Sequence, residues 1–484
     1  MKCLLLIPAW QPEDIFPSRT ARVQANYWQP LGILYVAAAL VEAGHEVTFC
    51  DGAFMSRRAL VQNVRARKPA FVGIYANTFL WRRAQRLADD IKQVDRSIFT
   101  CAGGPHPIGL KARGLDGATP NLDAVVTGEG ETIVPALVAR LACRGDLEGL
   151  PGIVFRKGRK VIVNPEAPLI QDLDRLPFPA RHLLENPHKY VSPPGTYKDP
   201  PVAAMITSRG CNHRCIYCFQ IDGERTGIRF RSIANVMAEI EQCLQQGFRE
   251  IRFLDDAFTA DYERAFEITR AIRARGLKFA WFASACVHQV DPPLLAAMHQ
   301  AGCWAVLLGA ESGVQKNLNA LRKGITPQQT RQAVKWAQQA GLKVITPFLF
   351  GIPGETFADG LRTIAFACRL DPDIASFHTI TPFPGTELFE TVRHYGTMSA
   401  NTDDFTFQGM AFTPHTMTRR EIERLRRIAF RSFYSRPTFL WRQLRQALVE
   451  KKPGRFKHLL LGLRSLFWLW VKGDLFRTRK GHEK

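Results

Sequence analysis

Continuous apolar runs alternate with amphipathic segments over the first 145 residues. The runs at residues 2–7, 46–50, 71–75 and 98–104 have the length of buried strands, and residues 31–45 and 82–94 between them have the length and spacing of helices. Strands that alternate with helices in this way form a parallel sheet covered on both faces, with ligands at the carboxyl ends of the strands. We therefore expect an α/β, doubly wound, Rossmann-like domain over residues 1–145.

A second alternating block occupies residues 201–395. Strand-like runs begin near Val202 and recur about six times, each followed by a helical segment, and one of these helices has Thr326 at its N-cap and Pro327 in its first position. This order predicts a partial, TIM-like (β/α)6 barrel with its functional groups on loops at the strand carboxyl ends. The Pro-rich residues 146–200, which include a small hairpin turning at Lys157-Gly158, are interpreted as a linker.

Charge is distributed unevenly along the 484 residues, which suffice for about three domains. The net charge is +21, and the segment from residue 419 to 484 holds 19 Lys and Arg against 5 Asp and Glu, a net +14. The main body is thus close to an ordinary globular protein, and residues 396–484 are expected to form a helical, basic C-terminal region.

The end of this region suggests a partner. Residues 458–471 are apolar but interrupted by Arg464, and a spanning helix needs about 20 apolar residues. Three aromatic residues there, Phe467, Trp468 and Trp470, favour a helix lying on an anionic membrane surface. The alternative is a helix packed on the barrel. Nucleic acid would also attract the charge, but no nucleic-acid-binding motif accompanies it, so this partner is disfavoured.

Three cysteines are grouped in "TSRGCNHRCIYCF", residues 207–219. Cys211, Cys215 and Cys218 are spaced C-x3-C-x2-C on the loop after the first barrel strand. The N-terminus turns polar and Pro-rich too early for a cleavable signal, so we expect a cytoplasmic, reducing setting in which grouped cysteines bind metal or catalyse. Three thiolates suit an iron–sulfur cube with one open iron. The alternative is a zinc site closed by His213 or a remote cysteine, because structural zinc takes four ligands.

The motif resembles the signature of the radical S-adenosylmethionine (SAM) superfamily. Further segments are similar to its cobalamin-binding family, and the similarity covers roughly residues 1 to 395: "PLGILYVAAALVEAGHEVTFCDGAF", "AGGPHP", "LDAVVTGEGE", "LDRLPFPAR", "FLDDAFT", "GAESG", "GIPGE" and "TPFPGTELF". The resemblance implies a [4Fe–4S] cluster on Cys211, Cys215 and Cys218, with SAM on the open iron.

The resemblance also implies a SAM site. Tyr217 and Phe219 would approach the adenine, and Asp255 and Asp256, which stand where many members carry Gly-Gly-Glu, would accept hydrogen bonds from the SAM ammonium or else cap a helix. Two further pairs are implied. Glu311 and Ser312 would hold the ribose hydroxyls or the methionine end, and Gly351 and Gly354 would let the backbone pass close to adenine or simply form a turn.

Cobalamin would occupy the N-terminal domain without a histidine on cobalt. The D-x-H-x-x-G pattern that supplies such a histidine is absent, and no G-x-G-x-x-G follows the first strand, which argues against a nicotinamide site. His106 is expected to be a hydrogen-bonding or solvent-facing residue rather than a cobalt ligand. Close approach of the corrin and its nucleotide tail is expected at four glycines instead: Gly103, Gly104, Gly128 and Gly130.

The resemblance implies an enzyme that methylates an unactivated carbon. A 5′-deoxyadenosyl radical would abstract hydrogen from a small-molecule substrate, and methylcobalamin would deliver the methyl group. A lipid or tetrapyrrole substrate is expected, with flavodoxin or ferredoxin as electron donor. The alternatives are a cyclase or rearrangement enzyme that uses both cofactors without methyl transfer, and a non-catalytic protein that holds a metal cluster.

Overall fold

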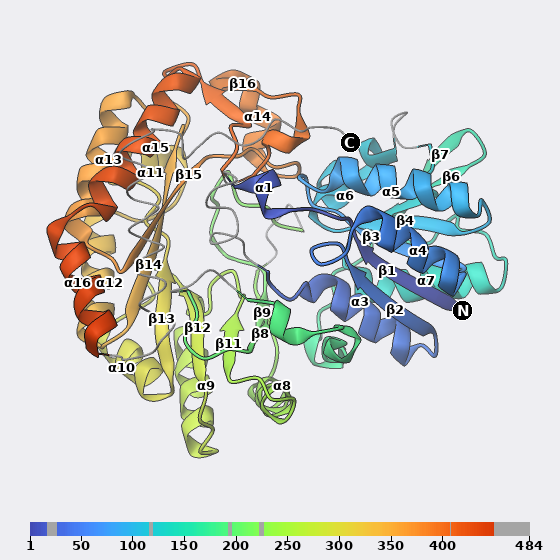
Figure 1. Cartoon of the computed structure of the whole chain (residues 1–484), viewed down its shortest axis with the longest axis horizontal. Coiled ribbons are helices and arrows are strands. Elements are labelled where there is room, and N and C mark those ends of the chain that lie inside the picture. The colour runs from blue at the N-terminus through green and yellow to red at the C-terminus, as the bar shows by residue number, and fades with distance from the viewer. Residues whose placement is uncertain (17–26, 116–119, 192–195, 222–226, 407, 450–484) are drawn as a thin grey trace.

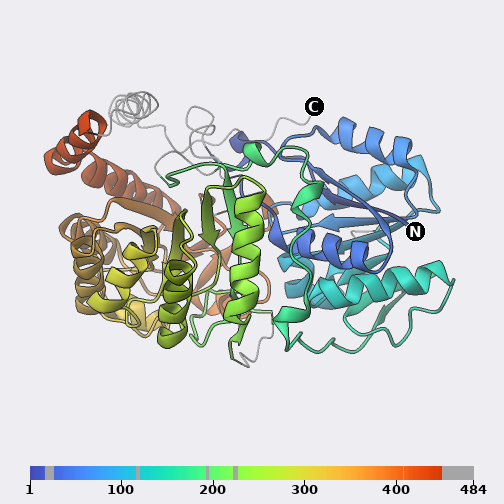
Figure 2. The same cartoon turned by 90° about the horizontal axis from the view of Figure 1, so that it is seen from below.

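The computed structural model describes residues 1–16, 27–115, 120–191, 196–221, 227–406 and 408–449. Two sheets lie beside each other, an N-terminal one in blue and cyan and a second in green to orange (Figure 1). The helices of each block cover its own sheet, and the two blocks lie side by side (Figure 2). This arrangement confirms the α/β class with a doubly wound domain and a partial barrel.

The first sheet has the strand order β2-β1-β3-β4-β5-β6-β7. The first five strands are parallel, and β6 and β7 add an antiparallel hairpin at one edge. The hairpin that the sequence indicated at Lys157-Gly158 therefore extends this sheet. The strands are β1 (Lys2–Ile7), β2 (Glu46–Asp51), β3 (Phe71–Tyr75), β4 (Phe99–Gly103), β5 (Ala124–Val126), β6 (Ile153–Lys157) and β7 (Lys160–Val163).

Helices cover both faces of this sheet, as apolar strands without alternation require. One of them, α3, is apolar around its whole circumference because it is buried on two sides: Leu34 packs into the sheet core, whereas Leu31 and Tyr35 contact Ala204 of the barrel. The helices are α1 (Pro12–Ile15), α3 (Leu31–Glu42), α4 (Arg57–Arg67), α5 (Trp81–Val94), α6 (Pro105–Leu110) and α7 (Gly130–Ala142), with the 3-10 turn η1 at Lys111–Leu115.

The second sheet contains six parallel strands in chain order, β8-β11-β12-β13-β14-β15. Its first and last strands do not pair with each other, so the barrel is open on one side. The strands are β8 (Val202–Met205), β11 (Glu250–Phe253), β12 (Ala280–Ala285), β13 (Cys303–Leu308), β14 (Lys343–Phe350) and β15 (Ile374–Thr379). Two short ribbons, β9 (Ser208–Arg209) with β10 (Arg229–Phe230) and β16 (Gly396–Met398) with β17 (Phe412–Pro414), flank it.

Capping residues define where the barrel helices begin. Thr326 is the N-cap of α12 and Pro327 its first residue, as expected, and the structure adds a capping box with Gln329; Thr356 and Asp359 form a capping box at the start of α13. The helices are α8 (Ile233–Gln245), α9 (Tyr262–Ala274), α10 (Pro292–Gln300), α11 (Gln315–Ala320), α12 (Pro327–Gln339), α13 (Phe357–Leu370) and α14 (Glu387–Tyr395).

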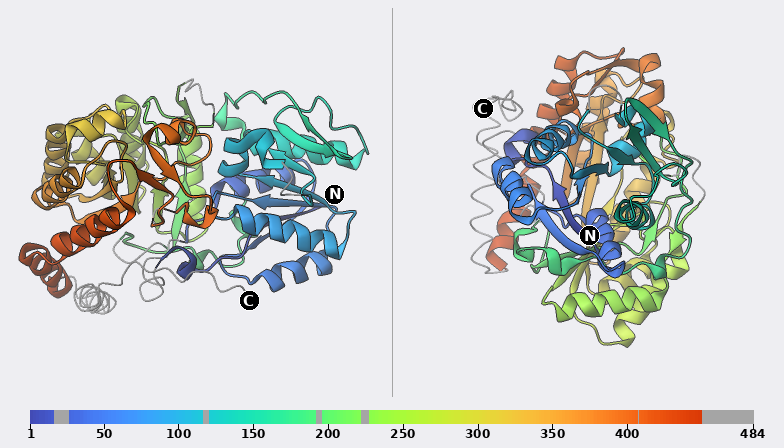
Figure 3. Two further views of the ribbon diagram at one scale, coloured as in Figure 1. Left: turned by 90° about the horizontal axis from the view of Figure 1, so that it is seen from above. Right: turned by 90° about the vertical axis from the view of Figure 1, so that its right-hand side faces the viewer.

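Two helices follow the barrel, α15 (Arg419–Tyr434) and α16 (Pro437–Val449), and run along its outer surface (Figure 3). The apolar stripe of α15, which includes Ile422, Leu425 and Phe433, packs into the barrel core, and Arg426 is the one basic residue of this helix that is buried with it. None of the helices that the structure describes is long and apolar enough to cross a membrane. The apolar segment 458–471 lies outside the described residues.

Candidate functional site

The loop that carries Cys211, Cys215 and Cys218, here called the cysteine loop, leaves the barrel at the carboxyl end of β8. Its base is closed by the β9–β10 ribbon and by Asp255, whose Oδ1 accepts hydrogen bonds from Thr207 N at 2.9 Å and from the Thr207 and Ser208 hydroxyls. Asp255 is buried, and burial raises the pKa of its carboxyl. Asp255 therefore fastens the start of the loop.

The three thiols differ in exposure: Cys215 is buried, Cys211 is half-buried and Cys218 is exposed. The Cys218 N–H donates to Cys215 O at 3.2 Å. A hydrogen bond to Cys215, together with desolvation, raises the pKa of the Cys218 thiol, and desolvation raises that of Cys211. Within the described part of the chain, no three His, Cys, Asp or Glu side chains are grouped for a single metal ion.

A lysine lies beside these thiols. Lys323 Nζ is 2.9 Å from Glu311 Oε1 and 3.5 Å from the Tyr217 hydroxyl. Although burial works against its charge, Glu311 and the neighbouring cysteines raise the pKa of Lys323. The loop thus has a permanent cation next to it, held by a buried carboxylate from the end of β13.

Ser312 is separated from this group. Its side chain is fully buried, and its hydroxyl interacts with Thr363 Oγ1 at 2.9 Å and accepts from Asn317 Nδ2 at 3.2 Å. Glu311 and Ser312 are adjacent in sequence, but only Glu311 reaches the cysteine loop.

Gly351 and Gly354 form the tight turn after β14, with φ of 79° and 75°. Glu355 closes this turn, because its Oε2 accepts from Gly351 N at 2.7 Å and Ile352 N at 3.2 Å. A Cβ on Gly351 would face Ile422 of α15 and Pro414, and one on Gly354 would face open space. The structure thus supports turn formation at both glycines.

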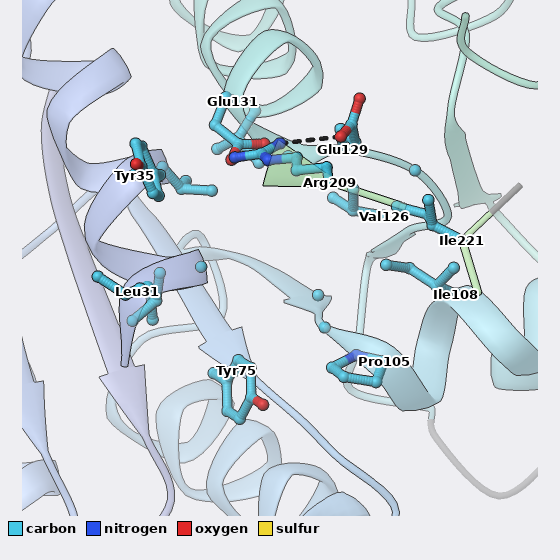
Figure 4. Close-up of a pocket in the computed structure, with 18 of the residues that line it drawn as sticks. Leu31, Tyr35, Tyr75, Pro105, Ile108, Val126, Glu129, Glu131, Arg209 and Ile221 are labelled. Atoms are coloured by element: carbon cyan, nitrogen blue, oxygen red, sulfur yellow. Dashed lines mark hydrogen bonds and ion pairs between the residues drawn. The ribbon is translucent and has the colours of Figure 1, made fainter. Parts of the chain in front are cut away.

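A cavity of about 500 Å³ separates the first sheet from the cysteine loop (Figure 4). The loop side contributes Phe219 and Asp256, and Asp256 also lies close enough to Cys211 to affect its pKa. All four glycines expected at a corrin line the other side: Gly103, Gly104, Gly128 and Gly130. At Gly104, where φ is 115°, an added Cβ would stand 2.7 Å from Ala76 O, so a larger residue is excluded.

His106 does not line this cavity. It is buried against Trp81, and its Nδ1 lies 3.1 Å from Thr78 Oγ1. Desolvation lowers the pKa of His106 to about 4, so the imidazole is neutral. Its position agrees with the expectation of a hydrogen-bonding residue.

Several residues at the site were missed in the sequence. Cys286 and His288 follow β12, and His213 of the cysteine loop lies 3.3 Å from Cys286 Sγ and contacts the His288 ring. Their position after a barrel strand was the available signal. Lys323 follows a helix, not a strand, and carried no such signal.

Two family models match the chain. The Radical SAM superfamily matches residues 205–367, and the B12 binding domain matches residues 20–138. A protein of Pyrococcus horikoshii described as an uncharacterized methyltransferase is 34% identical over 91% of this chain and 94% of its own length. The chain belongs to the cobalamin-binding radical SAM family. The cofactors of this family are a [4Fe–4S] cluster, SAM and cobalamin.

Other members of the family differ in reaction. An anaerobic magnesium-protoporphyrin IX monomethyl ester cyclase of Rubrivivax gelatinosus is 29% identical over 76% of this chain and 66% of its own length. The hopanoid C-3 methylase of Methylococcus capsulatus is 27% identical over 75% of this chain and 68% of its own length.

Solved structures of the family share the fold. The radical SAM methyltransferase TsrM from Kitasatospora setae superimposes with a TM-score of 0.67 at 20% identity, covering 89% of this chain and 83% of that one. The cobalamin-dependent S-adenosylmethionine radical enzyme OxsB superimposes with a TM-score of 0.75 at 15% identity, covering 96% of this chain and 70% of that one.

The residues present fit these cofactors. The cavity combines apolar walls with a glycine-lined edge at the carboxyl ends of a parallel sheet, where a flat ring can approach the backbone. The cysteine loop supplies three soft thiol ligands, the donor set of an iron–sulfur cube with one open iron.

Proposed function

We propose that this chain is a cobalamin-dependent radical SAM methyltransferase acting on an unactivated carbon of a hydrophobic small molecule. The observation that carries the proposal is the shared cavity, which has the four glycines of the first domain on one side and Phe219 and Asp256 of the barrel on the other. A cobalamin there would lie beside a cluster on Cys211, Cys215 and Cys218. When bound, cluster and SAM supply hydrogen abstraction, and cobalamin supplies the methyl group.

Different residues around the cysteine loop would bind different parts of SAM. Lys323 offers a cation to the SAM carboxylate, and Glu311 keeps that cation in place. Tyr217 and Phe219 flank the last cysteine and offer aromatic surface to the adenine. We expect Asp256, rather than Asp255, to accept from the SAM ammonium, because Asp256 lines the cavity, whereas Asp255 does not and its Oδ1 already accepts from Thr207 and Ser208. Ser312, which is fully buried against Thr363 and Asn317, does not belong to this group.

The lining of the cavity is predominantly apolar, which suits radical chemistry that must be kept from water. Its walls include Leu31, Ile108, Val126 and Ile221 (Figure 4). An electron must also enter from a donor such as flavodoxin or ferredoxin, and Cys218 is the most exposed of the three loop thiols.

A second candidate is a cyclisation that uses both cofactors without methyl transfer. The observation that favours it is the similarity to a magnesium-protoporphyrin ester cyclase, whose match spans three quarters of this chain. The two functions separate by product: a methyltransferase forms S-adenosylhomocysteine as well as 5′-deoxyadenosine, whereas a cyclase forms only the latter.

The test is anaerobic reconstitution with iron, sulfide, cobalamin and SAM. We expect labile sulfide, bound cobalt and 5′-deoxyadenosine from the wild type, and loss of cluster and of at least nine-tenths of the nucleoside product from Cys211→Ala, Cys215→Ala or Cys218→Ala. Cys143→Ala, an exposed cysteine outside the loop, is the control. Zinc without labile sulfide would refute the proposal, as would near-normal nucleoside formation by any of the three loop variants.

We also propose that the C-terminal region attaches the enzyme to anionic membranes, which would deliver a lipid or tetrapyrrole substrate. The support is the net +14 after residue 418 and the aromatic residues in 458–471, and each basic residue near an anionic surface contributes roughly 1 kcal/mol. We expect flotation with anionic but not neutral liposomes, weakened by salt. A chain ending at residue 449, which lacks the aromatic residues and half of the +14 charge, should float much less, and equal flotation of both forms would disprove attachment through residues 450–484.

A further inference from the structure

Four charged side chains line the cavity and join the two blocks of the molecule. Arg209 donates from Nη1 to Glu129 Oε1 at 2.9 Å and from Nη2 to Glu131 Oε1 at 2.6 Å. Arg229 donates to both oxygens of Glu129, at 2.8 and 3.0 Å. The two carboxylates begin α7 in the first block, whereas the two guanidinium groups belong to the barrel block (Figure 4). We call these residues the Arg209 cluster.

The arginines alone would repel each other. Arg209 and Arg229 are direct partners across the two-stranded β9–β10 ribbon, where like charges are unfavourable. Glu129 accepts from both arginines and Glu131 accepts from Arg209, so the two positive charges of the ribbon are balanced only when the first block contributes these two carboxylates. The β9–β10 ribbon therefore depends on carboxylates of the first block to offset the repulsion between its arginines.

The cluster is buried and directional. The side chains of Glu129 and Glu131 are 4% and 6% exposed, and the arginines 16% and 11%. Bidentate arginine–carboxylate pairs fix orientation as well as distance. Glu129 is additionally held by Ile170 N at 2.7 Å, and the Arg209 guanidinium lies 5.3 Å from the Tyr35 ring centroid. These contacts hold the side chains of the cluster in one arrangement.

The position of the cluster links the two cofactor sites. Arg209 precedes Gly210 and Cys211, so it stands at the root of the cysteine loop, and Glu129 lies between Gly128 and Gly130 in the turn that lines the cavity. Resting on the proposed function, we propose that the Arg209 cluster sets the separation and orientation of the iron–sulfur cluster relative to cobalamin. These are positioning residues.

The test measures that separation directly. In dithionite-reduced holoenzyme, cob(II)alamin and the reduced [4Fe–4S] cluster are both paramagnetic, and pulsed dipolar EPR gives their distance distribution. The double variant Arg209→Met/Glu131→Met removes one pair without leaving an orphan charge, because Glu129 keeps Arg229 and Ile170 N, and apolar replacement of a buried pair is often tolerated. We expect its distribution to broaden at least about twofold or shift beyond the wild-type width.

The matched control is Arg113→Met/Glu390→Met. This pair also joins the two blocks, at 2.9 Å, but is 55% and 58% exposed, and exposed pairs contribute little. Its distribution should match the wild type. If the Arg209→Met/Glu131→Met protein fails to fold, Glu131→Gln, which keeps shape and an acceptor, repeats the measurement with a smaller expected broadening.

Three outcomes decide the matter. Unchanged distribution in a fully loaded variant overturns the positioning role. Failure of the variant to bind cobalamin even at saturating concentration, with normal iron and sulfide, also overturns it, because the residues would then be cobalamin ligands; weakened binding, which a looser contact between the blocks would also cause, is overcome at saturation. A wild type that binds neither cofactor refutes the proposed function itself, whereas a wild type with a defined distance leaves that function standing whatever the variant shows.

Discussion

Burial sets the charge of a single carboxyl, Glu355, at the turn after β14. The side chain is fully buried, and desolvation raises its pKa to about 8. The folded protein therefore keeps a proton that the unfolded chain releases above its ordinary pKa of 4.5. By linkage, the stability that this proton contributes is fully present below about pH 4.5 and is lost as the pH rises through about 8.

We predict that Glu355→Gln flattens the pH dependence of stability. The amide keeps an acceptor for the Gly351 and Ile352 N–H groups but does not ionise. Between about pH 5 and 8 the wild type should lose a few kcal/mol of unfolding free energy relative to the variant, since each unit of pKa shift is worth about 1.4 kcal/mol. Urea denaturation across this range measures it, with the exposed Glu423→Gln as control. Parallel profiles for wild type and Glu355→Gln would contradict the prediction.

The sequence indicated which residue pairs lie near the site better than it indicated which side chain of each pair points into it. The resemblance singled out Asp255-Asp256 and Glu311-Ser312, which follow barrel strands, and the structure places one of each pair toward the cysteines or the cavity. Asp256 lines the cavity, whereas Asp255 binds Thr207; Glu311 meets Lys323, whereas Ser312 binds Thr363. Adjacent residues at a strand end point to opposite sides, and the pattern alone does not say which side faces the site.

At the scale of secondary-structure elements, two helices of the barrel block approach closely at a glycine. A Cβ on Gly360 of α13 would stand 2.4 Å from Leu425 Cδ1 of α15. This contact lets α15 bury its apolar stripe, which includes Ile422, Ala429 and Phe433, against the barrel. The strong basic charge of this helix therefore coexists with a structural role.

We predict that Gly360→Ala destabilises the protein by about 1–3 kcal/mol, the usual cost of overpacking. In isolation, alanine would favour the helix by about 1 kcal/mol, so a loss must come from the contact with α15. Leu425→Ala, which makes room, should partly rescue it, so that the double variant is less destabilised than the sum of the two single ones. Additive losses in denaturant unfolding would show that the helices do not meet here.

Elements were predictable where burial is uniform. The parallel strands read as apolar runs because both their faces are covered, and α12 showed its start through Thr326 and Pro327. The β6–β7 hairpin was recognised, but not its addition to the first sheet, since pairing with β5 depends on residues far apart in the chain. The Arg209 cluster was missed for the same reason: Glu129 and Arg209 are 80 positions apart.

On the scale of the whole molecule, a second contact joins the two blocks, between α6 and the loop after β15. A Cβ on Gly109 of α6 would stand 2.2 Å from Pro384 O, in the loop after β15. The next residue, Gly385, has φ of 86°, and its own added Cβ would meet Phe219 at 2.8 Å. The backbone of the first block thus touches the barrel beside the cysteine loop, and only glycine allows this approach.

We predict that Gly109→Ala introduces a steric clash that pushes the two blocks apart. The methyl group faces backbone rather than a flexible side chain, so the blocks must separate by a fraction of an ångström, at a cost of about 1–3 kcal/mol. Thermal unfolding should begin at lower temperature, and less cobalamin should remain bound after gel filtration, because the cavity has walls from both blocks. Gly114→Ala in η1 is the matched control, since its Cβ would meet neighbours only at 3.8 Å or more. If Gly109→Ala retains wild-type cobalamin and thermal stability while Gly114→Ala does the same, the two blocks are free to separate slightly, and the cavity does not depend on their contact at Pro384.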